Sequence, residues 1–214
     1  RAIANRPSLS ESVIAALCDH AGPAVVRILL DRDDVALAQT HLDSLGRRSD
    51  IVAALGMDLA GQDALTPDGL MGQFLHLPAP LKARAIAAAE TVSLVRQAQA
   101  PGGPASHSPR SASPTVRDAL VREALAQDRT RFADLLSQEL GLPQPTCDLL
   151  LRQDQLDGLT VAMKAVGLSR AQLATVLVRL AGKDLTLERL RELMRLHRSL
   201  GSGAAEVLVG QWLL

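Results

Sequence analysis

Three arginines share one side of a predicted helix near the C-terminal end of the chain, and guanidinium groups in a row can bind phosphates or carboxylates. They are Arg191, Arg195 and Arg198, at positions i, i+4 and i+7. Glu188 and Glu192 precede Arg191 and Arg195 by three residues, a spacing that allows ion pairs on a helix surface. We therefore expect a solvated face with ion pairs, and we keep the three arginines as candidate partner-binding residues.

His197 lies within the same segment and is the fourth candidate for binding a partner. Gly201 and Ser202 follow it about one helical turn later, as a glycine and a small residue do around the phosphorylated histidine of phosphotransfer domains. The lysine that usually precedes that glycine is Leu200 here. His197 also falls on the apolar side of the predicted helix, with Leu193 and others. We interpret it as a partly buried core histidine, with phosphotransfer as the alternative.

The remaining polar clusters do not match the known patterns of metal sites. Asp31, Asp33 and Asp34 lack the central glycine and closing glutamate of a calcium loop, so we assign them to helix ends and caps. No two of the five histidines are one helical turn apart, as a zinc site on a helix often requires. We expect no metal ion. The five are His20, His41, His76, His107 and His197.

Nucleophilic and phosphate-binding motifs are missing as well. Gly201-Ser202-Gly203 lacks the spacing of a Gly-x-Ser-x-Gly nucleophile elbow, and no Gly-x-x-x-x-Gly-Lys sequence occurs. Cys18 and Cys147 are far apart within apolar patterns, so we interpret both as buried hydrophobic residues rather than a disulfide or metal pair. We expect no catalytic residue and no cofactor.

The composition predicts an all-α protein. Of 214 residues, 47% are hydrophobic but only 1% are aromatic, so the core must consist of aliphatic side chains, many of them the strong helix formers Leu and Ala. Basic and acidic residues both number 23, and this balance disfavours a nucleic-acid partner. No apolar run reaches 18 residues and no signal peptide opens the chain, so we expect a cytoplasmic protein without a membrane span.

Hydrophobic periodicity predicts helical regions over residues 1–99 and 115–214, separated by a flexible Pro/Gly/Ser-rich linker over 100–114 that includes His107. Helices of about ten residues cannot bury an apolar stripe alone, so we expect antiparallel hairpins, stacked as an α-α superhelix or a two-layer bundle. Predicted N-caps are Asp33 or Asp34 before a helix containing Val35, Thr115 after the linker, and Ser169 and Thr186.

The first part of the chain resembles HEAT-like repeats. More narrowly, it is similar to an alphaproteobacterial family designated a domain of unknown function (family twenty-three thirty-six), and the region from Phe132 to Leu180 fits the second part of such proteins more loosely. The resemblance implies a helical-repeat surface and brings no catalytic residues. The phrases that carry it are Ile3-Ala4-Asn5-Arg6, Leu9-Ser10-Glu11-Ser12-Val13, Pro23-Ala24-Val25-Val26 and Leu29-Leu30-Asp31-Arg32-Asp33.

These observations favour a non-catalytic protein-interaction or regulatory module that presents a helical surface to a protein partner. A homodimer stays open as an arrangement, whereas we expect neither a nucleic acid nor a membrane as a partner. Phosphotransfer through His197 is the alternative function. DNA binding or repair, known among HEAT-like proteins, would need a basic concave face and aromatic side chains, and this chain has zero net charge and three aromatic residues.

Overall fold

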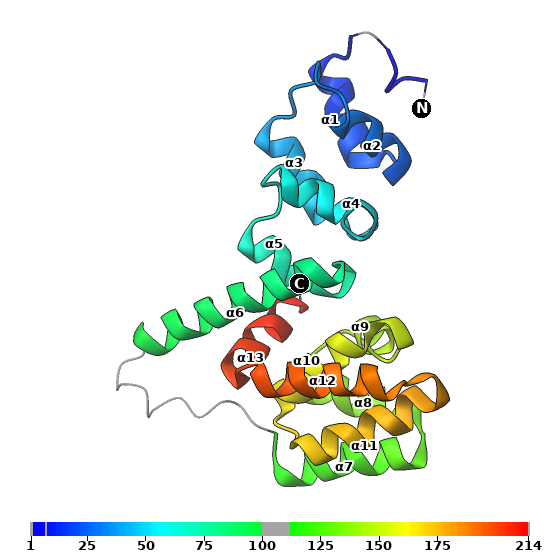
Figure 1. The fold of residues 1–214 in the computed structure, drawn as a ribbon, viewed down its shortest axis with the longest axis vertical. Helices are drawn as coiled ribbons and strands as arrows, with labels where there is room; N and C mark the ends of the chain where they lie inside the picture. The colour runs from blue at the N-terminus through cyan, green and yellow to red at the C-terminus, as the bar shows by residue number, and fades with distance from the viewer. Residues whose placement is uncertain (1, 7, 100–111, 214) are drawn as a thin grey trace. The chain divides into compact units, whose positions relative to one another are not determined.

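The computed structural model describes residues 2–6, 8–99 and 112–213, and over these ranges the chain forms thirteen α-helices, three 3₁₀ helices and no strand (Figure 1). The prediction of an all-α fold is confirmed for this part of the chain. The chain divides into two compact units, residues 1–85 and 86–214, with the division inside helix α6. Residues 100–111, which make up most of the predicted linker and include His107, lie outside the described residues.

Two helical hairpins build the larger part of the first unit. Helix α1 packs against α2 and α3 packs against α4, while α1 also contacts α3 and α2 contacts α4 (Figure 1). Aliphatic side chains from all four helices, such as Leu29 and Leu59, are buried between them. The elements of this unit are α1 (Glu11–His20), α2 (Pro23–Leu30), α3 (Gln39–Arg47), α4 (Ser49–Gly61), α5 (Pro67–Gly72), η1 (Phe74–His76) and the start of α6 (Ala79–Gln99).

The segment between α2 and α3 differs from the prediction that Asp33 or Asp34 caps a helix containing Val35. That segment is not helical, and α3 begins only at Gln39. The Asp34 carboxylate instead accepts a hydrogen bond from Arg32 Nε at 2.9 Å, so it is not available to helix amides. Arg32 Nη1 also donates to the carbonyl of Ala4 at 2.6 Å. The sequence prediction was wrong here because the carboxylate binds a guanidinium, which local spacing did not indicate.

Helix α10 lies at the centre of the second unit. Nine of its eleven residues are buried, and it contacts α8, α9, α11, α12 and α13 (Figure 1). Thr160 is fully buried within it, and its hydroxyl donates to the Leu156 carbonyl at 2.8 Å. Besides the rest of α6, the unit contains α7 (Pro114–Ala126), α8 (Arg129–Leu140), α9 (Gln144–Leu150), η2 (Gln153–Gln155), α10 (Leu156–Val166), α11 (Arg170–Ala181), η3 (Gly182–Asp184), α12 (Leu187–Ser199) and α13 (Ser202–Gln211).

Local signals set most helix ends in this unit. Gly167 follows α10 with a φ of +84°, a left-handed conformation that glycine adopts without strain. Ser169 then caps α11, because its hydroxyl accepts from the Gln172 amide at 3.3 Å and its own amide donates to Gln172 Oε1 at 3.0 Å. Thr186 caps α12 by accepting from the Arg189 amide at 3.1 Å. The predicted caps at Ser169 and Thr186 are confirmed.

The start of α7 corrects another predicted cap. Ser113, not Thr115, is the N-cap, and its hydroxyl accepts a hydrogen bond from the Val116 amide at 3.3 Å. Pro114 occupies the first helical position, where its missing N–H costs nothing and its fixed φ suits a helix. The helix therefore begins before Thr115, within the last residues of the segment that was predicted as linker.

Because α10 is enclosed by its neighbours, removing volume from it should destabilise the whole second unit. We expect Leu159→Ala, at a fully buried position, to lower the free energy of unfolding by about 2–5 kcal/mol. Val178→Ala on α11 is the control, because that side chain is 49% exposed and its loss should change stability by less than about 0.5 kcal/mol. Urea unfolding followed by the fluorescence of Trp212, the single tryptophan, measures both. Equal effects of the two substitutions would contradict the central role of α10.

Candidate functional site

A groove between the start of α11 and the outer side of α12 brings four arginines together. Its volume is about 500 Å³. Two half-buried side chains, Leu190 and Met194, contribute apolar surface. We call this site the arginine groove, and its exposed guanidinium side chains are those of Arg170, Arg191, Arg195 and Arg198.

The amphipathic pattern of α12 determines which side chains reach the groove. Leu193 and His197, four residues apart, are buried on the side of α12 that packs on α10 and α11. Leu190 and Met194 follow the edge of that buried stripe. The helical period then places Arg191, Arg195 and Arg198 further around the helix, where they are exposed.

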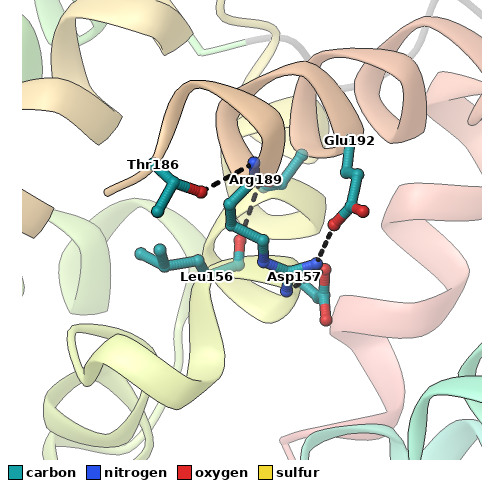
Figure 2. Close-up of polar contacts among 6 residues, drawn as sticks. Leu156, Asp157, Thr186, Arg189 and Glu192 are labelled. Atoms are coloured by element: carbon teal, nitrogen blue, oxygen red, sulfur yellow. Dashed lines mark hydrogen bonds and ion pairs between the residues drawn. The ribbon is translucent and has the colours of Figure 1, made fainter. Parts of the chain in front are cut away.

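A separate arginine, Arg189, links α12 to α10 through an ion pair. Figure 2 shows the Arg189 side chain between Asp157 of α10 and Glu192 of α12. Arg189 Nη2 lies 2.9 Å from Asp157 Oδ1, and Arg189 Nη1 lies 2.9 Å from Glu192 Oε2. The only ion pair that the described residues show for Glu192 is thus with Arg189, and not with Arg195 as the sequence spacing predicted. The pairing was mispredicted because Asp157, distant in sequence, holds Arg189 within reach of Glu192.

The positive charge of the arginine groove is not neutralised within the described part of the chain. No ion pair or hydrogen bond joins the side chains of its four arginines to other described residues, and no described aspartate or glutamate lines the groove. The predicted pair of Glu188 with Arg191 is therefore not formed. Like charges one turn apart on a helix repel by about 0.2–0.5 kcal/mol per pair. The cluster therefore costs the fold little free energy, and its charge can attract an anion.

His197 points away from the arginine groove and into the core. Its side chain is 4% exposed, and its Nε2 lies 3.0 Å from the carbonyl oxygen of Leu168. Its Nδ1 is buried and has no hydrogen-bond partner among the described residues. Burial, with the nearby charges of Lys164 and Arg170, lowers the pKa of His197 below its ordinary value of 6.5. The structure thus brings three of the four sequence candidates together and separates His197 from them.

Two glycines that follow His197, Gly201 and Gly203, lie in a packing contact with α6. Glu90 Oε1 accepts a hydrogen bond from the Gly201 amide at 2.7 Å, beside the N-terminus of α13. A Cβ atom on Gly203 would overlap Ser93 Oγ, so a side chain at this position would force the Ser93 hydroxyl to move. Phosphotransfer requires an accessible imidazole nitrogen, whereas Nε2 of His197 contacts a backbone carbonyl. The glycine spacing is explained by helix packing.

The other candidates from the sequence are also structural in character. Cys18 and Cys147 are free and fully buried, and burial raises the pKa of each thiol to about 11, so both stay protonated at neutral pH. Among the described residues, no group of three histidine, cysteine or acidic side chains is placed to hold a metal ion. None of the helices in that part of the chain combines the length and apolarity needed to cross a membrane.

Arg170 is the groove residue that sequence reasoning missed. It lies in the first turn of α11, directly after the Ser169 cap, and faces Arg191, Arg195 and Arg198 across the groove. Spacing along α12 reveals residues on one helix only. The packing of α11 against α12 brings Arg170 to them, and no local pattern encodes that contact.

The fold and this site define an all-α protein with an arginine-lined groove in its second unit. The chain belongs to the DUF2336 family, described as an uncharacterised protein conserved in bacteria, whose pattern matches residues 1–209. This confirms the family resemblance seen in the sequence. Searches of curated proteins and of solved structures found no match.

The buried, neutral state of His197 should make the second unit less stable in mild acid. The unfolded chain takes up a proton near the ordinary pKa of 6.5, before the folded chain does, so the free energy of unfolding should fall as pH decreases through that value. One such proton contributes at most about 1.4 kcal/mol per pH unit. We expect His197→Gln, which can still donate to Leu168, to flatten this dependence.

Urea unfolding followed by Trp212 fluorescence at several pH values between about 5.5 and 7.5 tests this expectation. His20→Gln, at the exposed end of α1, is the matched control and should keep the wild-type slope. If the His197→Gln protein and the wild type lose stability in parallel, His197 is not the group responsible.

Proposed function

We propose that the chain is a non-catalytic protein-interaction module, regulatory in character, that binds a protein partner through the arginine groove. One observation carries the proposal: four exposed guanidinium groups line the same groove as the apolar side chains of Leu190 and Met194, and none has an acidic partner among the described residues. Charged, partly apolar surfaces of this kind are typical of protein docking sites, where arginine and methionine are enriched.

The chemistry of the groove supports binding rather than catalysis. Its side chains are guanidinium groups, which remain protonated at any physiological pH, together with an alkyl group and a thioether. None of these can accept a proton near neutral pH or act as a strong nucleophile. The proposal therefore includes neither a cofactor nor a metal.

A protein fits the charge distribution of this chain better than a nucleic acid does. Binding to nucleic acid draws most of its affinity from many phosphate contacts, and the whole chain has no net charge. The groove offers one short row of cations beside apolar side chains. A partner with a few carboxylates and some apolar surface would complement it.

The proposal also includes a HEAT-like arrangement of the helices and a location in the cytoplasm. In the first unit, the contacts of α1 with α3 and of α2 with α4 are those expected when two hairpins stack in two layers. Stacked hairpins leave a continuous outer surface for further contacts.

Site-specific photo-crosslinking in the native bacterial host tests this proposal. A photoreactive amino acid at Met194 should yield covalent adducts with protein, and the adducts should decrease when Arg191→Gln and Arg195→Gln are added. The same amino acid at Val178, exposed on α11 and outside the groove lining, is the control. Adducts with nucleic acid, or protein adducts equal at the two positions, would contradict docking at the groove.

Neutralising one groove arginine should not harm the fold. We expect Arg195→Gln to leave the free energy of unfolding unchanged or to raise it by about 0.2–0.5 kcal/mol, because it relieves the repulsion with Arg191 one turn away. Arg189→Gln should instead destabilise the protein, because Arg189 links α12 to Asp157. Urea unfolding at low ionic strength measures both. A clear loss of stability in the Arg195→Gln protein would show that this arginine has a structural role.

A further inference from the structure

We infer that the occupant of the arginine groove is an acidic amphipathic helix of a protein partner. This inference rests on the proposed function, since it specifies which surface of a partner the groove accepts. It follows from the order of charged and apolar side chains along α12 and from the position of Arg170 opposite them.

The spacing of the arginine row determines the spacing of the carboxylates that the partner helix must carry. Arg191 and Arg198 are seven helical steps apart on α12, with Arg195 between them, or about 10 Å along the helix axis at 1.5 Å per residue. Carboxylates at i, i+4 and i+7 of a partner helix that runs alongside α12 would have the same spacing. Each planar guanidinium can then bind a carboxylate through two parallel hydrogen bonds.

The apolar side chains of the groove favour an occupant that is partly apolar over a purely ionic one. Leu190 and Met194 are one turn apart and form an apolar stripe next to the arginine row. A free phosphate or a polyphosphate chain would leave this stripe uncovered, whereas a helix with leucines beside its glutamates would bury it. Methionine side chains adapt to irregular apolar partners, which suits such a contact. The two parallel stripes therefore indicate an amphipathic helix.

Arg170 supplies a cation from the other wall of the groove. At the start of α11 the capping box engages the amides of Ser169 and Gln172, and the exposed guanidinium of Arg170 lines the groove. A partner helix lying between α11 and α12 would meet cations on two sides. This geometry favours a helix with acidic residues flanking its apolar stripe.

Fluorescence anisotropy with synthetic helical peptides and the full chain tests the inference. The probe peptide carries glutamates at i, i+4 and i+7 beside a leucine stripe. One control peptide has the same composition in scrambled order, and a second has glutamine in place of each glutamate. The protein variants are Arg191→Gln with Arg195→Gln, Met194→Ser, and Arg179→Gln, the last an exposed α11 arginine that does not line the groove.

We expect the probe to bind the wild type and the Arg179→Gln protein alike. Its affinity should fall about tenfold or more with the Arg191→Gln and Arg195→Gln pair, and several-fold with Met194→Ser. Both control peptides should bind at least tenfold more weakly than the probe. Unfolding curves of each variant establish that the protein is folded.

Four results would overturn the inference. The scrambled peptide could bind as tightly as the probe, which would show that charge attraction alone accounts for the binding. Met194→Ser could leave the affinity for the probe unchanged. An RNA oligonucleotide, inorganic polyphosphate or anionic vesicles could bind through the groove more tightly than the peptide does. If the peptide fails while protein adducts still form at Met194 in cells, the occupant is misassigned and the interaction module stands. If those adducts are also missing, the proposed function fails as well.

Discussion

Helix α10 exposes so little surface that its neighbours must cover it on every side, and the geometry of the second unit follows from this requirement. The side of α12 that carries Leu193 and His197 covers α10 and α11, and the pair of Arg189 with Asp157 fixes α12 at that contact. With one side of α12 fixed inward, the helical period directs its arginine row to solvent. The arginine groove is therefore a consequence of how the core is closed.

Basic residues serve two distinct purposes in the second unit. Arg117 Nη1 donates to the Gly167 carbonyl at 3.1 Å, and Arg129 Nη1 donates to the Leu180 carbonyl at 2.9 Å, so both satisfy backbone oxygens near helix ends. Lys164 does the same for the His197 carbonyl at 3.0 Å. These side chains hold helices together. The groove arginines have no such contacts with described residues, and this difference supports the proposal that they bind an external anion.

The sequence was a good guide at several positions where a local interaction determines the structure. Gly167 and the Ser169 cap fix the turn between α10 and α11 through contacts within a few residues, and the period of α12 correctly separates its buried and exposed sides. It was a poor guide wherever a long-range contact decides. Arg32, which binds the Asp34 carboxylate, also donates to the Ala4 carbonyl 28 residues away, and Arg170 joins the arginine row only through the packing of two helices. The row was therefore visible in the sequence, but the groove was not.

The sizes of two opposing free-energy contributions explain how the fold tolerates an uncompensated cluster of four cations. Repulsion between exposed arginines one turn apart amounts to a few tenths of a kcal/mol per pair, about 0.2–0.5 kcal/mol. Burial of a single leucine side chain such as Leu193 contributes about 1.5–3 kcal/mol in the opposite direction. The inner side of α12 can therefore hold the helix in place against the repulsion on its outer side. The proposed anionic partner would relieve that repulsion on binding, and this relief would then contribute to the affinity.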